Sequence, residues 1–95
     1  MAAYVIADVD VTDPVKYEDY KKLTPGAIAK HGGRFIARGG RTEVLEGASA
    51  PGRIVILEFP SLDRAKAWWS SPEYSEARLI RQATSEGTLL ILEGV

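Results

Sequence analysis

The stretch AYVIADVDVTDP, residues 3–14, leads from a strand pattern straight into a helix start. Residues 3–11 are rich in β-branched and aromatic side chains, which is typical of a strand. Thr12 and Asp13 offer capping side chains, and Pro14 suits the first helical position because the amide hydrogen that it lacks would have no partner there. The chain is therefore predicted to begin with a strand that is followed at once by a helix.

This first predicted helix has one stripe of mostly apolar and aromatic residues. At 100° per residue, the stripe consists of Tyr17, Tyr20, Thr24, Ala27, Ile28 and His31. Pro25 interrupts the helix, and we expect a kink or a short break there because proline lacks an amide hydrogen and clashes with the preceding turn. Gly32 and Gly33 are predicted to end the helix with a left-handed cap.

Two more strand patterns follow this helix. The segment RFIARGGRTEVLEG (34–47) is predicted to be a strand with a bulge at Gly39 and Gly40, and RIVILEF (53–59) is predicted to be a third strand.

The remaining chain is predicted to be helical until its last strand. Ser61 can cap the next helix, and Ser71 with Pro72 begins a further helical segment. Gly87 is predicted to end that segment, and TLLILEGV (88–95) forms the last strand.

The resulting order, β-α-β-β-α-β with the second helical region in two pieces, is that of the ferredoxin-like fold. It predicts an α+β protein with an antiparallel sheet of spatial strand order 4-1-3-2 and with the helices on one face. A chain of 95 residues has the size of one domain, so we expect a single domain over residues 1–95.

Composition argues against several classes of function. The net charge of −1 provides no electrostatic footprint for nucleic acid. The chain has no cysteine and one histidine, which excludes thiolate chemistry and disfavours a zinc site, so we expect no metal and no cofactor. The N-terminal residues lack the basic region of a signal peptide, and the aliphatic run LLIL (89–92) is far shorter than the ~20 residues that span a bilayer. We expect a cytoplasmic protein without nucleic-acid or membrane partners.

Alternation along the strands predicts two unlike faces of the sheet. The apolar set, expected beneath the helices, comprises Val5, Ala7, Val9, Val11, Phe35, Ala37, Val55, Leu57, Phe59, Leu90 and Leu92. The opposite set mixes large aliphatic side chains with charges and comprises Tyr4, Ile6, Asp8, Asp10, Arg34, Ile36, Arg38, Ile54, Ile56, Glu58, Leu89, Ile91 and Glu93. An uncovered face with this much aliphatic surface indicates an interaction site. A symmetric homodimer with a barrel-like space between two sheets is the simplest way to bury it.

The runs YVIADVDVTDP, AIAKHGGRFIARGGRTEVLEG, RIVILEFPS, WWSSPEY and LLILEGV cover nearly the whole chain and resemble a bacterial family of unknown function. The most specific parts of the resemblance are GGRFIARGG and SPEY. It implies a dimeric α+β barrel, similar in architecture to cofactor-independent antibiotic-biosynthesis monooxygenases, muconolactone isomerases and stress-induced barrel proteins. Such a likeness of fold does not carry a reaction with it.

Three charged residues of the second set, Asp8, Arg38 and Glu58, are predicted to share the aliphatic face. Charges in such a place must be paired or must shift their pKa, because isolated burial is costly. Arg38 can then bind a carboxylate or enolate ligand, with Asp8 or Glu58 as the proton acceptor and Tyr4 adding a hydroxyl group. The alternative is a structural network of ion pairs across a dimer interface, with Tyr4 as a packed aromatic residue.

The stretch KHGGRFIARGG (30–40) contains the single histidine. It runs from a helix to a strand, whereas a phosphate-binding loop runs from a strand to a helix, so the glycines are better explained as a cap and a bulge. His31 lies in the last turn of its helix, where a cationic ring interacts favourably with the helix dipole. It can also act as a general base if its ring reaches the barrel mouth.

The two tryptophans point about 100° apart on their helix. Trp69 is predicted to be a core residue, and Trp68 to line a cleft or contact the partner subunit. Tyr74, Arg78 and Arg81 form an aromatic and basic ridge, which a solvated helix face explains.

Two functions follow from these observations. In the first, a homodimer holds a pocket between the sheet and the partner subunit and binds a small apolar or aromatic compound with an anionic group, with metal-free isomerisation or oxygenation as its chemistry. In the second, the protein is a non-catalytic structural or stress-related assembly protein, and the charged set only fixes the dimer register.

Overall fold

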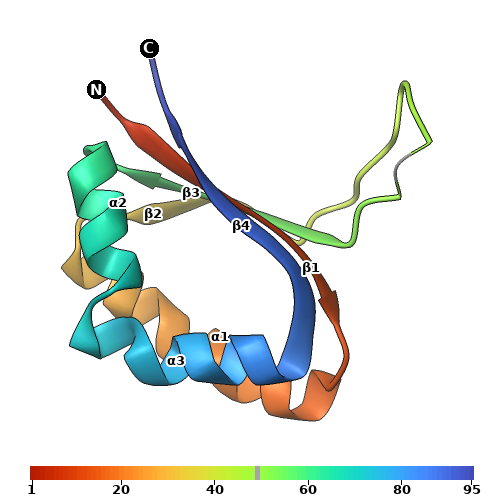
Figure 1. The fold of residues 1–95 in the computed structure, drawn as a ribbon, viewed down its shortest axis with the longest axis horizontal. Helices are drawn as coiled ribbons and strands as arrows, with labels where there is room; N and C mark the ends of the chain where they lie inside the picture. Colours follow the sequence, from red (N-terminus) through yellow and green to blue (C-terminus); the bar gives the residue numbers. More distant parts are fainter. Residues whose placement is uncertain (49) are drawn as a thin grey trace.

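The computed structural model describes residues 1–48 and 50–95. Its elements are β1 (Ala3–Val11), α1 (Pro14–Lys30), β2 (Arg34–Arg38), β3 (Arg53–Phe59), α2 (Leu62–Trp69), α3 (Pro72–Thr84) and β4 (Ser85–Glu93). The antiparallel sheet has the order β2-β3-β1-β4, and the helices lie on one side of it (Figure 1). The predicted ferredoxin-like α+β fold and its strand order are confirmed. We call the side under the helices the covered face and the other side the open face.

The helices begin at the predicted capping residues. The Asp13 carboxylate accepts a hydrogen bond from the Lys16 amide at 3.1 Å. The Ser61 hydroxyl accepts one from the Arg64 amide, and the Ser71 hydroxyl accepts one from the Tyr74 amide, both at 3.2 Å. Each cap satisfies an amide that the first helical turn leaves without a partner.

A kink or a short break was expected at Pro25, and helix α1 continues through this residue without a break. Proline leaves the carbonyl oxygen of the residue four positions earlier, Lys21, without its helical donor. The Nη2 atom of Arg38 donates a hydrogen bond to that oxygen at 3.5 Å. An arginine from strand β2 thus takes the place of the missing amide.

Strand β2 is shorter than predicted and its irregularity lies elsewhere. The strand ends at Arg38, and the residues that follow it, 39–48, extend away from the sheet (Figure 1). Phe35 lies opposite Leu57, but Ala37 lies opposite Ile56, so Ile36 is an extra residue. The bulge that was predicted at Gly39 and Gly40 therefore lies at Ile36 instead. The inserted residue reverses the alternation, which moves Ala37 to the open face and Arg38 to the covered face.

Strand β4 also differs from the prediction. Helix α3 passes into β4 without a loop, and Gly87 lies inside the strand rather than at the end of the helix. Leu89 and Ile91 lie opposite Ala7 and Val5 and therefore point to the covered face. Leu90 and Leu92 point to the open face and are 50% and 55% exposed, so the predicted assignment of these four residues is reversed. Four consecutive aliphatic residues contain no polar residue to mark the exposed positions, so the sequence does not show which of them point to which face.

The core lies between the covered face and the helices. Trp68 is 1% exposed and its ring lies 4.2 Å from that of Tyr74 and 5.4 Å from that of Phe59, measured between centroids. Trp69 is 39% exposed, so the predicted roles of the two tryptophans are reversed. Tyr74 and Arg81 are buried, which also overturns the solvated ridge expected on α3. The stripe predicted on α1 is confirmed, because Tyr17, Thr24, Ala27 and Ile28 are buried there.

Candidate functional site

A cavity lies between the covered face of the sheet and the helices. Its apolar wall consists of Val5, Ala7, Val9, Ile28, Phe35, Val55, Leu57, Trp68 and Leu89. Its enclosed volume is about 30 Å³, which is room for about two water molecules. The enclosed space is therefore small, and a ligand with an aromatic ring can enter only if side chains of the wall move.

The polar part of the wall carries only one sign of charge. It consists of Tyr17, Tyr20, Lys21, Thr24, Arg38, Arg53 and Arg81. Four of these residues are cationic, and none of the described residues that line the cavity is a carboxylate or a histidine. We call this space the arginine cavity.

Arg81 of α3 is the most deeply buried of the cavity's cations, at 9% exposure. Its Nε atom donates a hydrogen bond to the Tyr74 hydroxyl at 3.4 Å. Within residues 1–48 and 50–95, Arg81 forms no ion pair with a carboxylate. Buried charges are normally paired, because an unpaired one has lost its hydration without compensation.

Arg53, the first residue of β3, points to the same cavity. Its Nη1 atom donates a hydrogen bond to the Tyr17 hydroxyl at 3.2 Å, and its guanidinium carbon lies 5.6 Å from the centroid of the Tyr17 ring. Gly39 has a φ of +67°, and a Cβ atom there would lie 2.9 Å from the Arg53 Nε atom. The first glycine after β2 thus leaves room for the Arg53 side chain, a role that its position in KHGGRFIARGG did not reveal.

The tyrosines beside these arginines remain protonated. Burial raises the pKa of the Tyr17 hydroxyl even though Arg53 opposes the change. Burial and the adjacent Tyr74 hydroxyl, which lies 2.9 Å away, raise the pKa of Tyr20 well above its ordinary value. Both hydroxyl groups therefore keep their hydrogen at neutral pH and are able to donate a hydrogen bond.

The sequence matches a protein-family model over almost its whole length. The family model described as a domain of unknown function, DUF1330, matches residues 2–95. The chain belongs to the DUF1330 family. A search of curated proteins finds no match.

Solved structures show what the DUF1330 protein resembles in fold. A protein of unknown function from Rhodopseudomonas palustris has a TM-score of 0.81 at 20% identity, with 99% of this chain and 82% of that chain covered. A dimeric ferredoxin-like protein of unknown function from Jannaschia has a TM-score of 0.74 at 14% identity, covering 99% and 100%. SnoaB, a cofactor-independent oxygenase from Streptomyces nogalater, has a TM-score of 0.67 at 14% identity, covering 99% and 93%. At these identities the likeness concerns the fold alone.

The DUF1330 protein does not bring the predicted charged set together. Asp8 and Glu58 lie on the open face, where Asp8 Oδ1 accepts a hydrogen bond from the Gly52 amide at 2.8 Å and Glu58 Oε1 accepts one from Arg34 Nε at 2.8 Å. Tyr4 lies directly opposite Glu58 in the sheet. Arg38 lies on the other face, with its guanidinium carbon 4.2 Å from the centroid of the Phe35 ring. The placement of Arg38 with Asp8 and Glu58 is therefore wrong, and the bulge at Ile36 is the reason.

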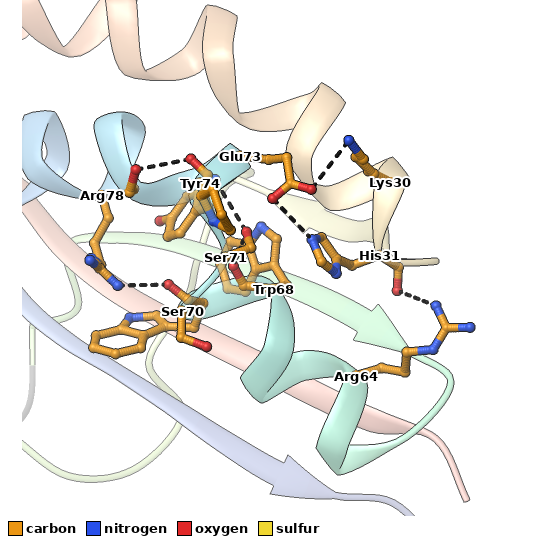
Figure 2. Close-up of polar contacts among 12 residues, drawn as sticks. Lys30, His31, Arg64, Trp68, Ser70, Ser71, Glu73, Tyr74 and Arg78 are labelled. Atoms are coloured by element: carbon orange, nitrogen blue, oxygen red, sulfur yellow. Dashed lines mark hydrogen bonds and ion pairs between the residues drawn. The ribbon is translucent and has the colours of Figure 1, made fainter.

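His31 lies outside the arginine cavity, between the end of α1 and the start of α3 (Figure 2). Its Nε2 atom is buried 3.9 Å from Glu73 Oε2, and its carbonyl oxygen accepts a hydrogen bond from Arg64 at 3.3 Å. Lys30 lies 3.2 Å from the same carboxyl group. A hydrogen bond from the backbone amide of Glu73, together with Lys30 and His31, lowers the pKa of the Glu73 carboxyl group. This cluster joins two helix ends and has no access to the cavity wall.

Trp68 is the one predicted ligand-binding residue besides Arg38 that lines the cavity, and it does so as a core residue. Arg53 and Arg81 also line the cavity and were not among the predicted site residues, although the sequence contains a signal for each. Arg53 continues the alternation of Val55 and Leu57, and Arg81 continues the buried stripe of α3.

Across residues 1–48 and 50–95, no three acidic, histidine or cysteine side chains lie close enough together to hold a metal ion. In the same part of the chain, none of the helices combines the length and the apolar character that crossing a membrane requires.

Proposed function

We propose that this DUF1330 protein is a homodimer that binds a small, mainly apolar or aromatic anion in the arginine cavity. The observation that carries the proposal is Arg81, a buried guanidinium group without a carboxylate among the described residues. The ligand class is the one that the sequence suggested, but the site moves from the open face to the covered face.

Charge and shape support the same class of ligand. A carboxylate or an enolate would offset the cost of burying Arg81 and can accept charge-assisted hydrogen bonds from a guanidinium group. Phe35, Leu57 and Trp68 offer apolar and aromatic contacts to the rest of the molecule. Because the enclosed space is small, even a single aromatic ring would have to displace side chains of the wall as it enters.

The cavity wall favours binding over proton abstraction. Its described residues include no carboxylate or histidine, and its tyrosines remain protonated. A reaction in this cavity would therefore act on a ligand that is already ionised. The fold likeness to a cofactor-independent oxygenase makes oxygenation of an ionised aromatic compound the first reaction to assay, ahead of isomerisation.

Removing the buried charge is expected to abolish anion binding. Wild-type protein should bind benzoate and not the uncharged benzamide, and Arg81→Met should weaken benzoate binding by about 10- to 100-fold, since hydrogen bonds to charged groups contribute about 1.5–3 kcal/mol. Isothermal titration calorimetry measures this difference. Arg41→Met is the matched control. Arg41 is exposed and pairs with Glu43, so this substitution removes one positive charge outside the cavity. Equal binding of benzoate and benzamide, or unchanged binding by Arg81→Met, would contradict the proposal.

The open face supports the homodimer. Ile36, Leu90 and Leu92 are exposed there or at its edge, and Ile6, Ile54 and Ile56 are only half-buried. Structures similar in fold from Jannaschia and from Bacteroides fragilis are described as dimeric. Packing the open faces of two copies together would remove this aliphatic surface from water.

A charge on the open face is therefore expected to separate the subunits. Leu90→Lys places two ammonium groups in a symmetric interface, one from each copy, and should weaken the dimer by at least about tenfold. Size-exclusion chromatography with light scattering reports the mass, and circular dichroism confirms the fold. Leu79→Lys on the exposed side of α3 is the control and should remain dimeric. A monomeric wild-type protein at micromolar concentration would refute the dimer. The mass of the Arg81→Met variant distinguishes the two candidate functions. If this variant loses benzoate binding and remains a dimer, Arg81 belongs to a binding site; if it dissociates, Arg81 serves the assembly of the dimer.

A further inference from the structure

The hydroxyl groups of Tyr20 and Tyr74 have one hydrogen more than their contacts use. Their oxygens lie 2.9 Å apart and share a single hydrogen bond. Each hydroxyl supplies one hydrogen, so two are present and one is used. Arg81 Nε, which can only donate, points to the Tyr74 oxygen at 3.4 Å and supplies no acceptor.

The free hydrogen belongs at Tyr20. Tyr74 is fully buried and does not line the cavity, whereas Tyr20 is half-buried and does. A hydrogen left on Tyr74 would have no acceptor, and an unsatisfied buried donor is costly. When Tyr74 donates to Tyr20, the Tyr20 hydrogen is free to point into the arginine cavity.

Tyr17 adds a second free hydroxyl hydrogen beside the first. Its oxygen accepts the hydrogen bond from Arg53, and its own hydrogen has no acceptor within the described residues. The rings of Tyr17 and Tyr20 lie 5.1 Å apart between centroids, one helical turn from each other on α1. The cavity therefore presents neutral O–H donors next to cationic N–H donors.

We infer that the ligand carries a neutral acceptor oxygen beside its anionic group, as an aromatic 2-oxocarboxylate does. This inference rests on the proposed function and deepens it. The carboxylate would accept hydrogen bonds from Arg81, and the adjacent keto oxygen would accept one from Tyr20. Arg81 and Tyr20 both contact the Tyr74 hydroxyl, which brings a cationic donor and a neutral donor near each other at the cavity.

Two probes separate the two interactions. Phenylglyoxylate and phenylacetate share the ring and the carboxylate and differ by a keto group in place of a methylene group. Wild-type protein should bind phenylglyoxylate about five- to tenfold more tightly in calorimetric titrations, which is the effect of one hydrogen bond. Tyr20→Phe should reduce this ratio to about one or two while leaving the affinity for phenylacetate within about twofold. Tyr4→Phe on the open face is the matched control and should keep the wild-type ratio.

The outcomes distinguish the two proposals. Equal binding of both probes by wild-type protein, or a ratio that survives in Tyr20→Phe, overturns the inference about the keto oxygen. The arginine cavity as an anion site still stands in that case if Arg81→Met loses both probes. Failure of both probes to bind wild-type protein overturns the inference together with the proposed function. If Tyr20→Phe does not fold, Tyr17→Phe removes the other free hydrogen and should lower the ratio instead.

Discussion

Trp68→Ala is expected to lower the free energy of unfolding by about 3–5 kcal/mol, a large part of the stability of a small domain. Trp68 is buried against Tyr74 and Phe59, and it also forms part of the cavity wall. Removal of the indole ring leaves a void that the surrounding strands and helices can fill only in part.

The neighbouring tryptophan provides the matched control. Trp69 is partly exposed and stacks on Arg78, with the guanidinium carbon 4.5 Å from the ring centroid. Trp69→Ala should therefore cost only about 1 kcal/mol. Urea unfolding followed by circular dichroism, at equal protomer concentrations, measures both variants. A larger loss in Trp69→Ala than in Trp68→Ala would show that α2 buries its other face.

Gly87→Ala is expected to destabilise the protein by about 3 kcal/mol or more, or to prevent its folding. Gly87 has a φ of +152°, a conformation that residues with a side chain rarely adopt, and a Cβ atom there would overlap with the carbonyl oxygen of Asp8 in the adjacent strand. Neither the backbone of β1 nor that of β4 can move away without breaking the ladder between them.

Gly26 provides the matched control for the Gly87→Ala substitution. Gly26 lies on the exposed side of α1, and a Cβ atom there meets nothing within 4 Å. Gly26→Ala should raise the free energy of unfolding by about 0.5–1 kcal/mol, because alanine favours the helix. Thermal unfolding of the two variants should therefore shift the transition in opposite directions. A stable, wild-type-like Gly87→Ala protein would mean that β4 does not approach β1 as closely as described.

The fold could be predicted because several local signals agree. The strand pattern of β1, the capping residues of the three helices and the burial stripe of α1 all appear in the structure where the sequence places them. The errors in assigning side chains to the two faces of the sheet arose where a pattern has no polar residue or where one inserted residue changes the alternation. The run LLIL concealed which of its residues point inward, and the residue inserted at Ile36 reversed the face of Arg38.

The candidate site was harder to predict than the fold. The proposed ligand class rests on apolar surface next to arginine, which the sequence contains, but the location of the site depends on which arginines face the helices. Arg53 and Arg81 belong to buried patterns, but the sequence assigns Arg53 to neither face of the sheet and places Arg81 on a solvated ridge. The directions of the tyrosine hydrogen bonds depend on contacts between residues as distant as Tyr20 and Tyr74, which no local pattern predicts.

The bulge at Ile36 has a consequence for comparing this protein with its relatives. Arg34 and Arg38 are separated by four positions, yet one pairs with Glu58 on the open face and the other lines the cavity. At identities near 20%, an alignment that treats β2 as regular would equate residues from opposite sides of the sheet. Tracing the arginines of this cavity across the family therefore requires superposed strands, with a gap allowed at the inserted residue.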